Sequence, residues 1–309
     1  MRILVTGGCG YVGSVLVPKL LKAGHRVAVV DVQWFGNYLA AHQDLTVHMQ
    51  DFRDQYPLRW YDAVIHLAAI ANDPTGDLDP KLTWEVNALG TMELAKRAAA
   101  AGVKHFIYAS SGSVYGVSNE EKVTEDTPCF PLSEYNKTKM VAERCVLSYA
   151  DRMVVQVVRP ATVCGYSPRM RLDVVVNMLT MQWLTKGKIT VLGGDQMRPN
   201  LHIDDMTDLY LWMLERPYVT GVFNASRQNL TVLDIAQGIA MGTMEDIDIH
   251  PSTDPRSYRM NSDKLTSLGF IPQRTVADAV IEIIHQYRQG KLTDEDDCYN
   301  IRTMKALCA

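Results

Sequence analysis

Hydrophobic and polar positions alternate in two distinct ways along the first half of the chain. Short runs rich in β-branched residues predict strands at residues 3–5, 26–31, 46–49, 63–66, 105–109 and 154–158. Between them, residues 11–23, 82–101 and 133–149 carry apolar side chains at helical spacing and are long enough for crossover helices. This alternation is typical of an α/β fold with a doubly wound parallel sheet that is covered on both faces.

The pattern becomes less regular beyond residue 160. Helices are predicted at residues 172–184, 204–214, 232–240 and 276–289. We expect two domains, 1–163 and a smaller α/β domain at 164–309, with some return of the chain to the first domain near 200–225. A ligand cleft is expected between the two domains. The acidic residues 294–297 predict a solvated tail.

Composition excludes several classes of partner. A hydrophobic fraction of 47%, a charged fraction of 21% and a net charge of -4 are ordinary for a globular protein and offer no field for nucleic acid or a membrane surface. No apolar run reaches the roughly 20 residues of a membrane span, and no signal-peptide pattern precedes the first strand, so we expect a cytoplasmic protein. The six cysteines are scattered, and we expect neither structural disulfides nor a metal.

A glycine-rich turn joins the first predicted strand to the first predicted helix. Gly7, Gly10 and Gly13 permit a tight turn and a close approach of the backbone to a pyrophosphate at the helix N-terminus. Asp31 ends the second strand, where a carboxylate can accept hydrogen bonds from the ribose of adenosine. The next two residues supply no positive charge for a 2′-phosphate. The sequence therefore predicts a Rossmann-type domain that binds NAD rather than NADP.

A tyrosine and a lysine one helical turn apart are the candidate catalytic pair. Tyr135 and Lys139 share one face of the helix predicted at 133–149. A phenol with an ordinary pKa of about 10 is a poor base, and a nearby ammonium group together with a nicotinamide cation is expected to favour its phenolate. Ser111 lies in a loop that begins where the strand at 105–109 ends, and ligands of open α/β sheets bind at such strand ends. This set predicts proton transfer at an alcohol.

Together these motifs resemble the extended short-chain dehydrogenase/reductase family, in its NAD-dependent nucleotide-sugar epimerase/dehydratase branch. The resemblance covers nearly the whole chain and includes the stretches 66–69 and 87–91. It implies a nucleotide-diphosphate sugar as substrate, a homodimer formed through the helices at 82–101 and 133–149, and catalytic roles for Ser111, Tyr135 and Lys139. The cofactor residues that it implies are Gly7, Gly10, Tyr11, Val12, Gly13, Asp31, Asp51, Phe52, Leu67, Ala68, Ala69, Asn87, Tyr135, Lys139 and Pro160.

The resemblance also limits the reaction. Members similar to 4,6-dehydratases or sugar-acid decarboxylases carry a glutamate where this chain has Ser113. We therefore expect chemistry at C4, as a 4-epimerase that forms a transient 4-ketosugar, with a C4 dehydrogenase or ketoreductase as the alternative. A 4,6-dehydratase is disfavoured, and a non-catalytic NAD sensor is the hypothesis from another class. The residues after Arg159 depart from the pattern of hexose 4-epimerases.

The stretch 167–173 is similar to a subgroup that includes C4 oxidases of GDP-linked heptoses. Its two guanidinium groups suit a diphosphate or a carboxylate, although ion pairs with Asp173 would explain them equally. His202 lies alone at the end of a predicted strand, and we expect it to have a structural role and not a catalytic one. The residues expected to bind substrate are Ser113, Thr162, Arg169, Arg171, Asn177, Arg198 and Arg256, and Asn72 is a further candidate for contact with the sugar.

Overall fold

The central sheet has seven strands, and every neighbouring pair in it is parallel. The structure is a computed structural model that describes residues 1–252, 254 and 256–308. The strand order is β10-β6-β5-β4-β1-β2-β3. The bounds are β1 Arg2–Thr6, β2 Arg26–Asp31, β3 Leu45–Met49, β4 Ala63–His66, β5 His105–Ala109, β6 Val154–Pro160 and β10 Gly221–Ala225. The predicted doubly wound α/β fold is confirmed.

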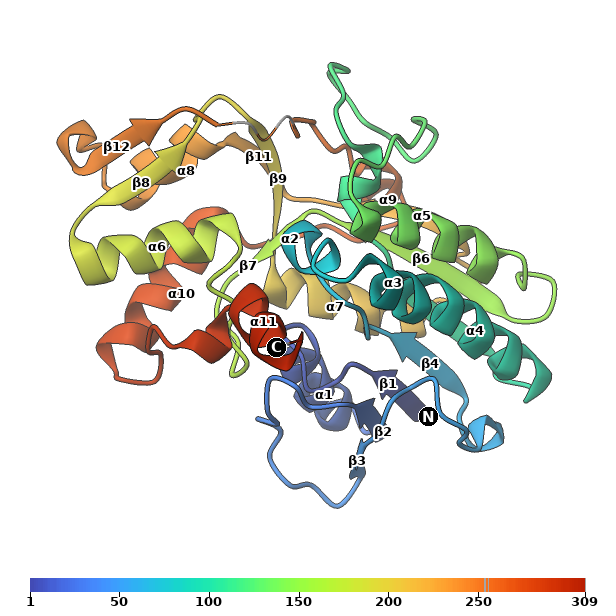
Figure 1. The fold of residues 1–309 in the computed structure, drawn as a ribbon. Coiled ribbons are helices and arrows are strands. Elements are labelled where there is room, and N and C mark those ends of the chain that lie inside the picture. The colour runs from blue at the N-terminus through green and yellow to red at the C-terminus, as the bar shows by residue number, and fades with distance from the viewer. Residues whose placement is uncertain (253, 255, 309) are drawn as a thin grey trace.

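Helices cover both faces of this sheet, as Figure 1 shows. Alternate residues of β1 enter two different cores. Ile3 and Val5 pack on the side of α1 (Gly13–Lys22) and α7 (Ile203–Leu214), whereas Leu4 packs on the side of α4 (Thr91–Ala100) and α5 (Glu134–Leu147). This period of two follows from the pleat of a strand. The layer of α4 and α5 also contains α3 (Pro80–Thr83) and a π-helical segment (Trp84–Gly90).

The rest of the chain forms a smaller unit with a core of its own. Its sheets are β11-β9-β7 and β12-β8. Their bounds are β7 Thr162–Cys164, β8 Ile189–Leu192, β9 Met197–His202, β11 Gln228–Thr231 and β12 Ile247–His250, with helices α6 Val175–Lys186, α8 Val232–Ile239 and α10 Val276–Arg288. Helix α9 (Asp263–Ser267) packs against β10 of the central sheet instead. The chain returns to the central sheet through α7 and β10, and the division at residue 163 stays a prediction. No helix within the described residues has the length and apolarity of a membrane span.

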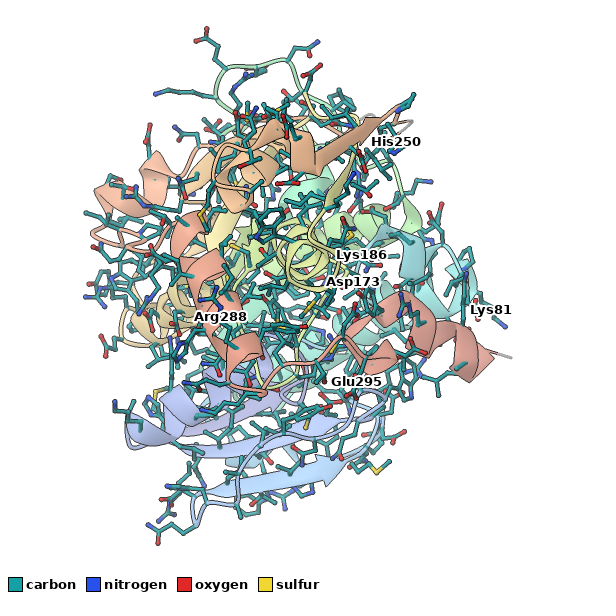
Figure 2. All side chains as sticks on the ribbon, turned by 90° about the vertical axis from the view of Figure 1, so that its left-hand side faces the viewer. Lys81, Asp173, Lys186, His250, Arg288 and Glu295 are labelled. Atoms are coloured by element: carbon teal, nitrogen blue, oxygen red, sulfur yellow. The ribbon has the colours of Figure 1, made fainter. Side chains whose placement is uncertain are left out.

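Two local expectations were wrong. The helix predicted from residue 172 begins at Val175, because the carboxylate of Asp173 bonds to Arg171 and Asn72 instead of lying in a helical turn. Figure 2 shows Asp173 amid packed side chains, whereas Lys81 and His250 lie at the periphery. The acidic residues 294–297 are exposed, but they are no free tail: a 3-10 turn (Asp296–Cys298) leads into helix α11 (Asn300–Cys308), which packs near α2 (Asp73–Gly76).

Candidate active site

A cavity of about 740 Å³ lies at the carboxyl ends of the central strands. Ligands of open α/β sheets bind at this edge. The structure brings nearly all of the predicted site residues to this cavity. Those that line it are Gly7, Gly10, Tyr11, Val12, Gly13, Asp31, Asp51, Phe52, Leu67, Ala68, Ala69, Ser111, Ser113, Tyr135, Lys139, Pro160, Thr162, Arg169, Arg171, Arg198 and Arg256.

The glycine-rich turn is shaped for close backbone approach. Gly7 has a φ of +73°, and a Cβ atom there would lie 2.6 Å from the backbone nitrogen of Ala68. A Cβ atom at Gly13 would lie 2.4 Å from the carbonyl oxygen of Gly8. Any side chain at either position would therefore collide with the backbone. The turn leads directly into α1, whose first N–H groups can meet a pyrophosphate.

Asp31 faces the cavity from the end of β2. Its two carboxylate oxygens accept hydrogen bonds from the backbone N–H groups of Cys9, at 2.9 Å, and Gln33, at 2.8 Å. Burial raises the pKa of Asp31, while these two hydrogen bonds and the nearby charge of Arg169 oppose the increase. The carboxylate is thus held in place by the same turn that contains Gly7, in the position expected for contact with a ribose diol.

Tyr135 and Lys139 lie at the centre of the site, on one face of α5. The ammonium group of Lys139 donates a hydrogen bond to the carbonyl oxygen of Ala109 at 2.8 Å and lies 5.9 Å from the centre of the Tyr135 ring. Burial lowers the pKa of Lys139 to about 7, with an opposing effect of Glu143. The end of β5 therefore fixes the lysine beside the tyrosine.

The protein's own groups hold the pKa of Tyr135 above its ordinary value, and the lowering of that pKa by Lys139 and a nicotinamide cation stays a prediction. Burial, followed by the charge of Asp73, raises the pKa of Tyr135 to about 12, although a hydrogen bond with Ser111 and the charge of Arg171 lower it. A buried phenolate is costly because the cavity wall replaces water. The protein alone holds Tyr135 as a phenol at neutral pH.

A chain of hydrogen bonds connects Ser111 to Arg256, beyond the central sheet. The hydroxyl groups of Ser111 and Ser113 lie 2.7 Å apart, Ser113 donates to the Asn136 carbonyl, and the Asn136 amide donates to Asp73 at 2.8 Å. Asp73 also accepts from Ser133 and pairs with Arg256. We call Ser111, Ser113, Asn136, Asp73 and Arg256 the serine network. Asp73, Asn136 and Ser133 were not predicted as site residues from the sequence, because only the tertiary fold brings them to the loop of Ser111 and Ser113.

A buried ion pair stabilises the loop that carries Ser110 and Ser111. Glu143 and Arg159 form a buried ion pair, with 2.7 Å between the carboxylate oxygen and the guanidinium nitrogen, and Ser110 donates a hydrogen bond to Glu143. Arg159 also donates to the hydroxyl group of Tyr115. Because Glu143 lies one helical turn after Lys139, this pair connects α5 rigidly to β6 and to the loop that carries Ser111. A glutamate on the helix face of a catalytic lysine was the sequence signal that could have indicated it.

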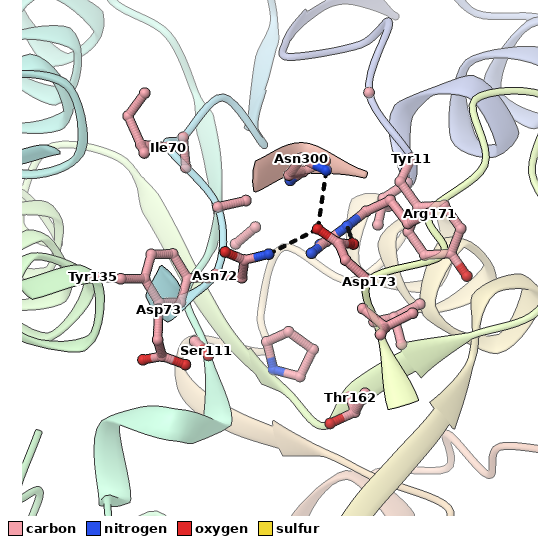
Figure 3. Close-up of a pocket in the computed structure, with 18 of the residues that line it drawn as sticks. Tyr11, Ile70, Asn72, Asp73, Ser111, Tyr135, Thr162, Arg171, Asp173 and Asn300 are labelled. Carbon is pink, nitrogen blue, oxygen red and sulfur yellow. Dashed lines mark hydrogen bonds and ion pairs between the residues drawn. The ribbon is translucent and has the colours of Figure 1, made fainter. Parts of the chain in front are cut away.

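The arginines of the smaller unit divide into two groups. Arg198 and Arg256 both pair with Asp254 at one end of the cavity, at 2.9 and 2.6 Å. Arg171 pairs with Asp173 near the centre, beside Asn72, as Figure 3 shows. Arg169 was expected to bind substrate, but its guanidinium group lies 4.0 Å from the centre of the Phe35 ring, on the side of the cavity that contains Asp31.

Two predicted binding residues do not reach the cavity. The Asn87 amide accepts from the N–H and donates to the carbonyl of Ile70, and it thereby holds the loop after β4. The Asn177 amide accepts from the N–H of Gly165 and donates to the Tyr11 hydroxyl and the Arg171 carbonyl. Both are almost fully buried, so each asparagine supports the wall from behind.

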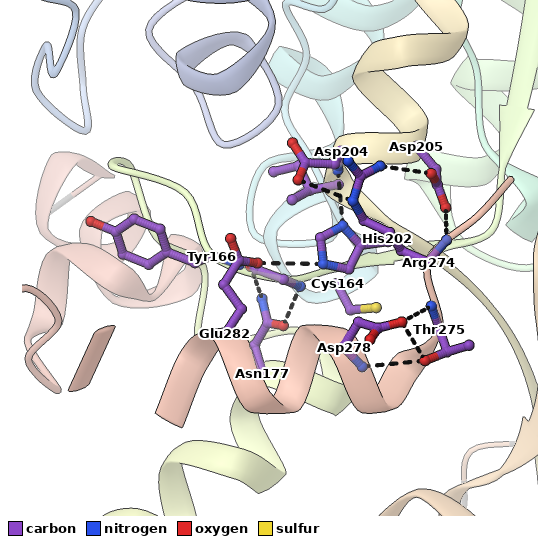
Figure 4. A network of polar contacts seen from close by, with 12 residues as sticks. Cys164, Tyr166, Asn177, His202, Asp204, Asp205, Arg274, Thr275, Asp278 and Glu282 are labelled. Carbon is purple, nitrogen blue, oxygen red and sulfur yellow. Dashed lines mark hydrogen bonds and ion pairs between the residues drawn. The ribbon is translucent and has the colours of Figure 1, made fainter. Parts of the chain in front are cut away.

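His202 also lies outside the cavity. It caps α7 by accepting a hydrogen bond from the N–H of Asp204, and its other ring nitrogen lies 3.4 Å from the Glu282 carboxylate (Figure 4). It is a structural residue of the smaller unit, as the sequence indicated.

Comparison with known proteins agrees with this geometry. Residues 3–226 match the NAD dependent epimerase/dehydratase family. The chain belongs to this family. A family member from Lactobacillus helveticus, named UDP-glucose 4-epimerase, is 29% identical over 91% of this chain and 95% of the relative. UDP-glucuronic acid decarboxylase 1 of Arabidopsis thaliana is 27% identical over 96% of this chain and 72% of the relative.

The fold of this family member is shared with solved structures. The structure of UDP-glucose 4-epimerase from Thermus thermophilus, in complex with NAD, superimposes with a TM-score of 0.82 at 25% identity and covers 93% of this chain and 99% of that chain. The protein is an NAD-dependent enzyme of the epimerase/dehydratase family. Its own residues fit the cofactor, because the tight glycine-rich turn leads into the N-terminus of α1 beside the cavity and Asp31 presents a carboxylate there.

Proposed function

We propose that this family member is a nucleotide-sugar 4-epimerase that acts through a transient 4-ketosugar. The observation that carries the proposal is the arrangement of Ser111, Tyr135 and Lys139 at the cavity centre, with Ser113 where an acid would be needed for other reactions. The relatives with epimerase names support it, but the chemistries within the family differ. The nucleotide sugar as substrate is part of this proposal.

The residues divide the work at one carbinol centre. Tyr135 removes the proton of the C4 hydroxyl group, and Ser111 hydrogen-bonds the same oxygen. Lys139 holds the ribose next to the nicotinamide and supplies positive charge beside Tyr135. NAD, held by the glycine-rich turn and Asp31, would supply the hydride acceptor and donor at C4, together with the positive charge that favours a Tyr135 phenolate. Tyr135 then returns its proton to the oxygen.

We assign the nucleotide end of the substrate to two arginines of the cavity. Arg198 and Arg256 would bind the diphosphate, for which guanidinium groups are well suited. Ser113 and Thr162 would contact the sugar, together with Asn72, whose φ of 75° is unusual for a residue other than glycine. The homodimer through α4 and α5 belongs to the same proposal.

Dehydration is disfavoured because no free carboxylate is available near Tyr135 among the described residues. Ser113 has no acidic group, and the nearby carboxylate of Asp73 is engaged by Ser133, Asn136 and Arg256. These three contacts occupy the carboxylate oxygens of Asp73 and hold them away from the substrate side of the network. Asp73 is therefore a poor candidate for removal of a C5 proton.

The second candidate is a C4 dehydrogenase or ketoreductase that exchanges its cofactor. The similarity of residues 167–173 to the subgroup with heptose C4 oxidases favours it. Incubation with a panel of UDP- and GDP-linked sugars, with absorbance of reduced cofactor and product identity followed together, separates the two. Inversion at C4 without net reduced cofactor supports the epimerase, whereas net reduced cofactor or a stable 4-ketosugar contradicts it.

A further inference from the structure

The C-terminal segment of the chain lies across the cofactor side of the cavity. We call residues 292–308 the C-terminal strap. Figure 1 shows its helix α11 at the middle of the molecule, and α11 contacts α2, which lies far from it along the chain. Asn300 and Ile301 of the strap line the cavity directly, and Asn300 is buried. The strap thus contributes to a site whose other cofactor residues come from the first half of the chain.

Hydrogen bonds join the strap to the loop before α6. The Asn300 side-chain oxygen accepts a hydrogen bond from Arg169 at 2.6 Å, and its backbone N–H donates to Asp173 at 3.1 Å. The backbone N–H of Leu172 donates to the Cys298 carbonyl at 2.8 Å. Figure 3 shows Asn300 and Asn72 meeting at Asp173. The N-terminal end of α11 is therefore fixed over the centre of the cavity.

Two other contacts anchor the strap to the dinucleotide-binding half. Met304 is 3% exposed and belongs to the core cluster that contains Phe52 and Ile70, which both line the cavity. On the opposite side, the Tyr38 hydroxyl group, in the loop after β2, donates to Asp297 at 3.0 Å. The strap consequently extends from the loop after β2, which follows Asp31, to the core cluster that contains Phe52.

Arg169 is a buried cation that lies within range of the charges of Asp31 and Asp173 but forms no direct ion pair with a described residue. It is 3% exposed, its Nε atom has no hydrogen-bond partner among the described residues, and its hydrogen bond to Asn300 is with a neutral group. Burial lowers its pKa to about 10, so it remains charged at neutral pH. A buried guanidinium group without a direct ion pair is costly, so Arg169 is placed to bind an anionic ligand in the cavity that it lines.

From this geometry we infer that the C-terminal strap closes the cofactor site, and that NAD binds and leaves only when the strap is displaced. Asn300 acts as a positioning residue that aims Arg169 at the dinucleotide, and Met304 holds the strap down. A cofactor retained in this way can return the hydride that it received, which suits a turnover without net redox change. The inference rests on the NAD site and not on the identity of the sugar.

The test compares three substitutions in α11 of the full-length protein. Asn300→Ala removes the acceptor of Arg169, Met304→Ala loosens the anchor, and Lys305→Ala changes an exposed neighbour as the control. NADH dissociation is followed by fluorescence after a chase with excess NAD, and NADH association by stopped flow with protein freed of cofactor. Thermal unfolding establishes that each variant is folded.

We expect dissociation to accelerate at least about tenfold in Asn300→Ala and Met304→Ala, since each factor of ten corresponds to about 1.4 kcal/mol and each variant loses a buried contact. Association should accelerate too, because the strap must open in both directions, and Lys305→Ala should match the unmodified protein. Faster dissociation with unchanged association would contradict the proposal that the strap closes the cofactor site. Unchanged rates in folded variants would contradict it too. None of these results depends on whether the enzyme epimerises a sugar.

Discussion

The amide group of Asn136 donates a hydrogen bond to the carboxylate of Asp73 at 2.8 Å. A carboxylate only accepts hydrogen bonds, so this contact directs the Asn136 carbonyl toward Ser113. Ser113 must then donate to that carbonyl, and its oxygen is left to accept from Ser111. One carboxylate thereby fixes the direction of the serine network in the protein alone, in which Ser111 donates to Ser113 and accepts from the backbone N–H of Ser113.

Replacement of Asp73 tests its effect on the catalytic base. The carboxylate raises the pKa of Tyr135, so Asp73→Asn should lower that pKa. Because the phenolate is the active base, the rise of kcat with pH should shift to lower pH, by about one unit at most. Asp77→Asn, an exposed residue next to the same short helix, is the matched control and should leave the pH profile in place. A profile of Asp73→Asn that shifts to higher pH would refute this electrostatic role.

Ser113 offers a second test of the serine network. Ser113→Thr keeps the hydroxyl group that donates to Asn136, whereas Ser113→Ala removes it. We expect the alanine variant to lose about tenfold in kcat, the loss of one positioning hydrogen bond, and the threonine variant to retain most of the activity. Steady-state kinetics of both variants decide the matter. Equal loss in the two would mean that space at residue 113, not hydrogen bonding, matters.

Asp31 should control the choice of cofactor. Its carboxylate is held by the N–H groups of Cys9 and Gln33 and would repel a 2′-phosphate. Asp31→Ala should weaken NAD binding by about tenfold or more, the value of a hydrogen bond to a charged group, and reduce discrimination against NADP. Titration calorimetry with both cofactors measures this. Unchanged affinities would show that Asp31 only closes the turn.

The buried pair of Glu143 and Arg159 should dominate the local stability. Glu143→Ala leaves the Arg159 guanidinium group buried without its partner, and the free energy of unfolding should fall by about 3–5 kcal/mol. Glu215→Ala removes the partner of Arg216 in an exposed pair and should cost about 1 kcal/mol or less. Urea unfolding of both variants gives the comparison. A similar small loss in each would contradict the structural role of Glu143.

The sequence predicted the parts of the site that depend on local pattern. The glycine turn, Asp31 and the pair Tyr135 and Lys139 lie at the ends of regular elements whose periodicity can be read along the chain. Asp73 could not be found in this way, because it begins a four-residue helix without periodicity and reaches Asn136 only through the tertiary fold. The strap was missed for a related reason: its acidic approach is polar, and among the described side chains of α11 Met304 is the one buried apolar group.

The central claim is that a hydride leaves C4 of a nucleotide sugar and returns to the same carbon. The most direct measurement uses sugar nucleotides of both bases that carry deuterium at C4, with products analysed by NMR and mass spectrometry. We predict inversion at C4 with the deuterium retained there, and no turnover by Tyr135→Phe. Deuterium found in released reduced cofactor, or lost to solvent, would contradict the account.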